Sequence, residues 1–63
     1  MAERDYNVAI RIDPLYIKAY ISRGIFYYEQ KKYNLAIRDW KKATSLGSKE
    51  NLQPWIQKAL REK

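Results

Sequence analysis

The sequence predicts an all-α fold, a short α-solenoid fragment of four helices in antiparallel pairs, on three observations. Apolar residues recur every three or four positions, and the two-residue alternation of a half-buried strand is absent. Proline, glycine and polar clusters divide the chain where helices should begin and end. A shift of 34 residues aligns the start of the chain with a later segment, and a period of this length is typical of stacked helix pairs.

The first helix should occupy the segment before Asp13-Pro14, with Ala2, Tyr6, Ala9 and Ile12 inward and Arg4, Asn7 and Arg11 outward. Asp13 is a good N-cap, and proline suits the first helical position, so we expect the second helix to begin near Pro14.

The second helix is predicted to be buried on two sides. One side carries Ile17, Tyr20, Ile21, Gly24, Tyr27 and Tyr28, and the other carries Ala19, Phe26 and the stem of Arg23. A polar strip of Lys18, Ser22 and Glu29, bordered by Ile25, remains for solvent.

The third helix should start after the polar break at residues 31–34 and end at Leu46, because Gly47 can close it in the left-handed conformation. Its inward side is Ala36, Ile37, Trp40, Ala43 and Thr44, opposite Arg38, Lys41, Lys42 and Ser45. Asn51 can cap a last helix from about Leu52 to Arg61, with Leu52, Trp55, Ile56, Ala59 and Leu60 inward.

The 34-residue shift places one helix of the chain on another. It aligns Ala2 with Ala36, Arg4 with Arg38, Asp5 with Asp39, Tyr6 with Trp40, Ala9 with Ala43 and Ile12 with Leu46. The comparison fails further on, where Gly24 would meet Lys58, so the final helix is expected to be a terminal cap.

These residues carry a family resemblance. Ile17–Glu50 resembles one tetratricopeptide repeat, whose pattern is matched by Tyr20, Gly24, Tyr27, Ala36, Trp40 and Ala43. Arg23 stands where the family commonly has Leu, Ser48 where it has Pro, and Lys31-Lys32 where it has a Gly-Asp turn. Ala2–Pro14 is similar to the second half of a preceding repeat.

We therefore divide the chain into three parts. Residues 1–14 are the second-helix half of a preceding repeat, residues 15–50 are a complete helix pair, and residues 51–63 are an amphipathic C-terminal cap.

A glycine inside a helix costs about 1 kcal/mol of stability relative to Ala, so Gly24 requires a packing reason. We expect that the paired helix approaches closely there, near Ala36. Repeat arrays usually need about three units. We expect the chain to be the C-terminal end of a longer array; the alternative is a homo-oligomer that covers the exposed edge of the first helix.

Composition excludes several functions. The chain has no Cys and no His, which removes disulfides, thiolate chemistry and His-based catalysis or zinc binding. Its carboxylates are scattered, and Asp39 is expected to pair with Lys42 or Lys32. We predict no enzyme, no cofactor and no metal. The absence of a long apolar run predicts no membrane partner, and we expect an intracellular, cytoplasmic location.

The resemblance implies a non-catalytic protein–protein interaction module, because tetratricopeptide arrays hold partner segments on the concave face of the first helix of each pair. The positions implied here are Lys18, Ile21, Ser22, Ile25, Tyr28 and Glu29. For Ile21 and Tyr28, the alternative to a place in the binding groove is packing in the core. The subgroup that clamps an acidic chaperone tail uses Lys, Asn and Arg on this face; only Lys18 is compatible, so that ligand is not predicted.

A basic surface supplies the alternative function. The formal net charge is +6, and Lys31, Lys32, Arg38, Lys41 and Lys42 could form a patch along the third helix that binds RNA, with Tyr33 nearby to stack on a base. Charged helix exteriors are ordinarily only solvated, and Trp40 is predicted inward, so the protein-binding function is preferred.

Overall fold

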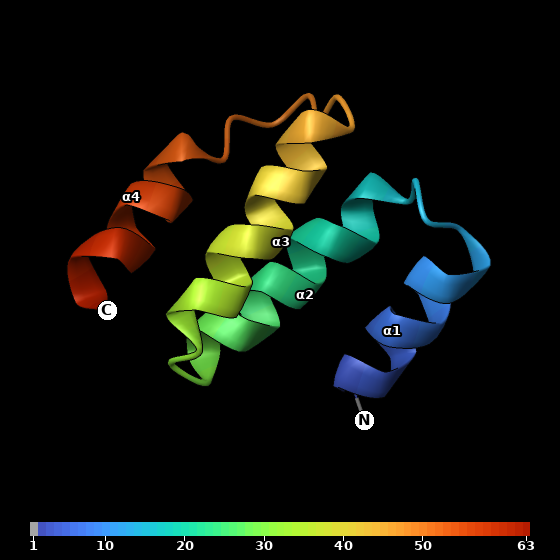
Figure 1. Ribbon diagram of the computed structural model, residues 1–63, viewed down its shortest axis with the longest axis horizontal. Helices are drawn as coiled ribbons and strands as arrows, with labels where there is room; N and C mark the ends of the chain where they lie inside the picture. The colour runs from blue at the N-terminus through green and yellow to red at the C-terminus, as the bar shows by residue number, and fades with distance from the viewer. Residues whose placement is uncertain (1) are drawn as a thin grey trace.

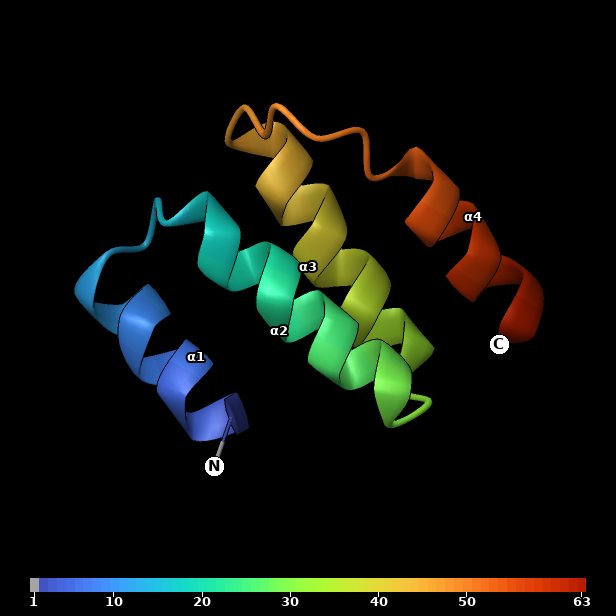
Figure 2. The same ribbon diagram turned by 180° about the vertical axis from the view of Figure 1, so that it is seen from behind.

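The structure, a computed structural model, describes residues 2–63 and, for side chains, the chain from Arg4 onward. It contains α1 (Ala2–Ile12), α2 (Ile17–Glu29), α3 (Tyr33–Ser45) and α4 (Gln53–Glu62), each antiparallel to the one before it (Figures 1 and 2). No strand occurs in residues 2–63, which confirms the all-α prediction. The predicted inward position of Ala2 lies outside the side chains that are described.

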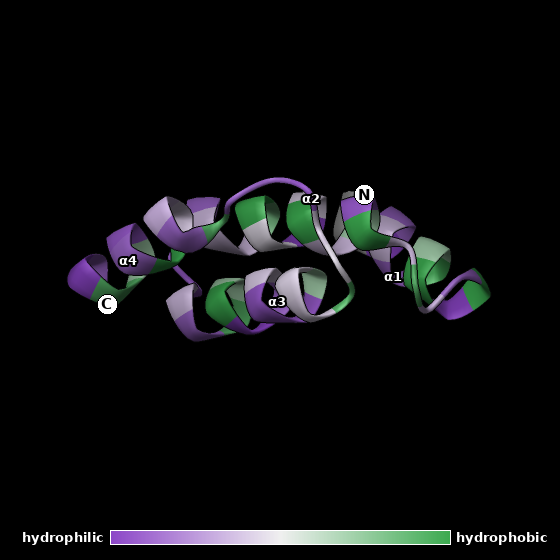
Figure 3. Ribbon diagram, turned by 90° about the horizontal axis from the view of Figure 1, so that it is seen from above, coloured by the Kyte–Doolittle hydropathy of each residue, from purple (hydrophilic) through white to green (hydrophobic). Residues whose placement is uncertain are grey.

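The helices pack in chain order, with α2 and α3 forming the closest pair, α4 against α3, and α1 against α2. Seen from above, α3 lies beneath α2, and α4 and α1 lie to either side (Figure 3). The molecule measures 33 × 26 × 13 Å, so it is a thin slab. Helices at the two ends of such a slab are covered on fewer sides than the central pair.

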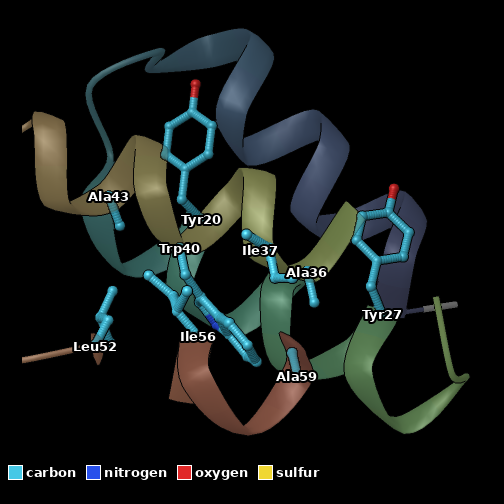
Figure 4. Close-up of a cluster of buried hydrophobic side chains, with 9 residues drawn as sticks. All are labelled: Tyr20, Tyr27, Ala36, Ile37, Trp40, Ala43, Leu52, Ile56 and Ala59. Atoms are coloured by element: carbon cyan, nitrogen blue, oxygen red, sulfur yellow. The ribbon is translucent and has the colours of Figure 1, made fainter. Parts of the chain in front are cut away.

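Trp40 is the centre of the core, and its side chain is 0% exposed (Figure 4). Its indole occupies the space above Gly24, where a Cβ would lie 2.3 Å from the ring nitrogen. The prediction that Gly24 makes room near Ala36 was wrong in this detail, because the Trp40 ring, about one helical turn further along α3, fills the space. The buried cluster comprises Tyr20, Tyr27, Ala36, Ile37, Trp40, Ala43, Leu52, Ile56 and Ala59.

The start of α2 differs from the prediction. Asp13 does not cap the helix: its Oδ1 accepts a hydrogen bond from the Leu15 amide at 3.1 Å, and its carbonyl accepts one from the Tyr16 amide at 3.0 Å. An aspartate that bonds to the amide two residues on forms a local turn instead of a cap. Pro14 therefore lies in the turn, and α2 begins at Ile17.

Two helix ends share one geometry. Gly47, at φ 98°, donates to the Thr44 carbonyl at 3.0 Å, and the Ser48 amide donates to the Ala43 carbonyl at 3.1 Å. These paired bonds form a Schellman motif, and they confirm the predicted stop at Gly47. The end of α2 repeats the motif with Lys31 at φ 62°, a conformation that L-residues rarely adopt.

Several positions predicted to face inward are more open. Ile12 is 77% exposed, Trp55 44% and Leu60 43%, because α1 and α4 lie at the ends of the slab. Thr44 is also exposed, and its hydroxyl donates to the Trp40 carbonyl at 3.0 Å within its own helix. The last helix runs one residue later than predicted. Leu52, and not Asn51 as predicted, is its N-cap residue; Asn51 Oδ1 accepts a hydrogen bond from the Gln53 amide, two residues on, at 3.1 Å.

Candidate functional site

A groove of about 590 Å³ runs along α2 beside the loop between α3 and α4. Its apolar side is a stripe of isoleucines spaced four residues apart, which places them on one side of the helix. The groove is lined by Ile17, Lys18, Ile21, Ser22 and Ile25 of α2 and by Gly47, Ser48, Lys49 and Glu50 of the loop.

The groove combines an apolar floor with a charged rim. Ile25 is 38% exposed, and Ile17 and Ile21 are half-buried because they also pack against the core. The charged residues Lys18, Lys49 and Glu50 also line the groove, and all three are exposed. Such a surface can bury one or two apolar side chains and pair with charges on either side of them.

The structure brings four of the six predicted binding residues into this groove: Lys18, Ile21, Ser22 and Ile25. Glu29 is exposed at the far end of α2, outside the groove. Ile21 both lines the groove and packs against the core, so the two positions predicted for it are combined in one residue.

Tyr28 lies in an aromatic cluster instead. Its ring centroid is 5.4 Å from that of Tyr33, 5.9 Å from that of Trp40 and 6.4 Å from that of Trp55. Its hydroxyl donates a hydrogen bond to the Glu62 carboxylate, and this bond raises the pKa of Tyr28 to about 12. Tyr28 therefore holds α4 against the α2–α3 pair.

Sequence reasoning missed Ile17 and the four loop residues as part of the groove. Ile17 was identifiable, because it stands one turn before Ile21 on the same side of the helix. The loop residues carry no such signal. They reach α2 because α3 is antiparallel to it, which returns the end of α3 to the start of α2.

An ion-pair network on another side of α2 fixes the orientation of the helix. Arg23 Nε and Nη2 each donate to Asp39 at 2.8 Å, and Nη1 donates to Asn7 Oδ1 at 2.8 Å. One guanidinium thus joins α1, α2 and α3. The predicted partners of Asp39, Lys42 and Lys32, were wrong; Arg38 is its second neighbour, at 3.6 Å.

The physical cause of this pairing is burial. Asp39 is 1% exposed, and a buried carboxylate requires a partner with matched geometry, which the planar guanidinium supplies. The hydrogen bonds to Asp39 raise the pKa of Arg23 above its ordinary value. The two residues are 16 positions apart, so helical spacing alone does not reveal the pair.

The five predicted nucleic-acid residues fall into two places. Lys31 and Lys32 form the turn before α3 and line a cavity of about 370 Å³, together with Tyr33, Asn34, Leu35, Glu62 and Lys63. Arg38, Lys41 and Lys42 lie exposed along the outward side of α3, outside that cavity. Tyr33, the predicted stacking residue, packs edge-on against Tyr28.

Among the side chains described, from Arg4 onward, no cluster of three or more acidic groups could hold a metal ion. None of the helices described is long and apolar enough to cross a membrane.

Comparison with known proteins identifies a relative over part of the chain. The chain is similar to a DnaJ homolog subfamily C member 7 homolog from Dictyostelium discoideum, with 47% identity over 45 residues. The match covers 71% of this chain and 8% of the relative, so the chain spans less than a tenth of that protein. No family model and no solved structure matches. The four-helix architecture is compatible with a tetratricopeptide-like unit.

Proposed function

We propose that this chain is a non-catalytic protein-interaction module of the tetratricopeptide type, which binds a peptide segment of a partner protein in the groove along α2. In this proposal, residues 15–50 form the binding pair, residues 1–14 are half of an adjoining repeat, and residues 51–63 cap the last face. The similarity to a DnaJ homolog supports an interaction role of the co-chaperone type.

The uncovered isoleucine stripe carries the proposal. α2 is buried against α1 on one side and α3 on another, yet Ile25 remains 38% exposed beside two partly buried isoleucines. Covering the 38% of Ile25 that is still exposed contributes about 0.6–1.1 kcal/mol, which is roughly a 3- to 7-fold change in affinity. Lys18 and Lys49 can then discriminate between peptides by charge.

A display library of random peptides, selected on the immobilised protein, supplies the probes for a test. Affinities of the selected peptides are measured by fluorescence anisotropy for the wild type and for Ile25→Asp. A buried aspartate opposite an apolar peptide side chain should weaken binding at least about tenfold. Circular dichroism of the variant should match the wild type, because Ile25 is outside the buried cluster.

Leu60→Asp is the matched control. Leu60 is 43% exposed on α4 and does not line the groove, so the same chemical change should leave peptide affinity within about twofold. Equal binding by wild type and Ile25→Asp would remove the groove assignment. Equal loss in both variants would show that added negative charge, and not the groove, decides binding.

Nucleic-acid binding through Lys31, Lys32, Arg38, Lys41 and Lys42 is the second candidate, supported by their exposure and the net charge of +6. The packing of Tyr33 on Tyr28 and the burial of Trp40 weaken it, because neither ring is free to stack on a base. It requires RNA affinity that falls steeply with salt and is reduced by Lys41→Glu with Lys42→Glu. Affinity that is absent or insensitive to salt would exclude it.

A further inference from the structure

The internal repeat shows what α1 should pack against. Under the 34-residue shift α1 corresponds to α3, and α1 packs against α2 as α3 packs against α4. α3 has a second and closer partner in α2, whereas the described chain gives α1 no equivalent of it. The outer side of α1 forms one edge of the slab (Figures 1 and 3).

Corresponding side chains are less buried in α1 than in α3. Trp40 is 0% exposed, and its counterpart Tyr6 is only half-buried. Leu46 packs against the core, and its counterpart Ile12 is 77% exposed. The apolar positions of α1 therefore match a packing partner that the described residues do not contain.

The charges show the same difference. Asp39 is buried and held by the two-bond pair with Arg23, whereas its counterpart Asp5 is exposed and forms no ion pair with any described side chain. Asp5 opens onto a cavity of about 230 Å³ between α1 and α2. The lining of this cavity is Asp5, Tyr6, Ala9, Tyr16, Lys18, Ala19 and Ser22.

We propose that this open side of α1 binds an amphipathic helix with the pattern of α2, in which an arginine pairs with Asp5 and a neighbouring small residue faces the ring of Tyr6. The α2–α3 pair is the template: Arg23 meets Asp39, and Gly24 leaves room for Trp40. The interface centres on α1, in the half of the preceding repeat, whereas the peptide groove lies between α2 and the loop after α3. Lys18 and Ser22 of α2 line both the groove and the cavity at Asp5.

A second copy of this chain is a poorer occupant on the same evidence. The Arg23 guanidinium already makes both of its paired bonds to Asp39, and α2 is committed to α3. A second copy could expose that side of its α2 only if it lost the packing between its own α2 and α3.

The test supplies the helix covalently. A copy of residues 13–34 placed directly before Met1 keeps the 34-residue period, so the added helix would meet α1 as α2 meets α3. We expect the thermal midpoint to rise by at least about 10 °C. In the extended chain, Asp5→Arg and the Arg-to-Asp change at the copy of Arg23 should each lower the midpoint by about 5 °C or more, and the two together should restore it.

Two controls make the outcome specific. In the chain of 63 residues, Asp5→Arg should shift the midpoint by no more than about 3 °C, because Asp5 is exposed and unpaired there. In the extended chain, Glu50→Arg makes the same charge change on an exposed residue of the loop between α3 and α4, which does not line the cavity at Asp5, and it should have little effect.

Three results would overturn the proposal. The first is an extended chain no more stable than the original. The second is a gain in stability that Asp5→Arg and Glu50→Arg reduce equally, since the arginine pairing would then be absent. The third, from light scattering, is a dimer of the original chain that Asp5→Arg dissociates, because the open side of α1 would then bind a second copy.

Discussion

Arg23 of α2 and Asp39 of α3 form a paired interaction with two N–H···O bonds of 2.8 Å. In the sequence, Arg23 is a departure from the tetratricopeptide pattern and Asp39 is one of several scattered carboxylates. The Arg23 side chain is 13% exposed and that of Asp39 only 1%, so the pair is largely removed from water. The third arm of the guanidinium holds Asn7 of α1. Three helices therefore depend on one side chain.

Arg23→Leu should destabilise the protein, although tetratricopeptide repeats commonly have Leu at this position. The substitution removes both short hydrogen bonds from the buried Asp39 carboxylate and leaves it only the exposed Arg38 at 3.6 Å, at a cost of about 3 kcal/mol. Urea unfolding followed by circular dichroism measures the loss. Arg23→Leu with Asp39→Ala should recover much of it, because no buried charge then remains; a single variant as stable as the wild type would contradict this account.

Gly24→Ala should also destabilise the protein, against the helix propensity of the two residues. Propensity alone favours Ala by about 1 kcal/mol, but the new methyl group would lie 2.3 Å from the Trp40 ring nitrogen. We expect a net loss of about 1–3 kcal/mol in unfolding free energy. Combining Gly24→Ala with Trp40→Leu should show strong coupling between the two sites, and additive effects would argue against the contact.

Lys31→Gly should stabilise the protein by about 0.5–1 kcal/mol. Lys31 has φ 62°, a conformation that strains a residue with a side chain by about 1–2 kcal/mol, and glycine would relieve this strain. Part of the stabilisation is offset because glycine makes the unfolded chain more flexible. Gly47→Ala is the matched converse, since Gly47 ends α3 with φ 98° and has open space around it. The midpoint temperature of thermal unfolding should rise for Lys31→Gly and fall for Gly47→Ala.

The attachment of α4 should weaken above pH 10. The hydrogen bond from Tyr28 to Glu62 raises the phenol pKa from 10.0 to about 12, so the protonated phenol is favoured in the folded state. The resulting stability is fully present below pH 10 and is lost as the pH rises towards about 12.

An ultraviolet titration of the phenolates tests this. The chain has six tyrosines, and Tyr28→Phe should remove a phase that titrates late. Tyr16→Phe, at an exposed position of the α1–α2 turn, should leave the late phase in place. Loss of the late phase in both variants, or in neither, would assign it elsewhere.

The sequence by itself determined the number of helices, their order and most of their inward positions. Apolar spacing follows directly from the 3.6-residue turn, and Gly47 marks a helix end because few other residues adopt its conformation. Trp40 and Ala43 were predicted inward and are 0% exposed. Lys18, Ile21, Ser22 and Ile25 of the groove lie on neighbouring strips of α2, so helical periodicity was sufficient to associate them.

Only the tertiary structure decided which residues meet across helices. The partner of Asp39, the ring above Gly24, the loop beside Ile25 and the packing of Tyr28 on Trp55 all depend on how antiparallel helices are set against one another. Periodicity specifies which side of a helix a residue occupies, but not the rotation or register of the facing helix. Those are fixed by the volume of Trp40 and by the geometry of the guanidinium and carboxylate groups.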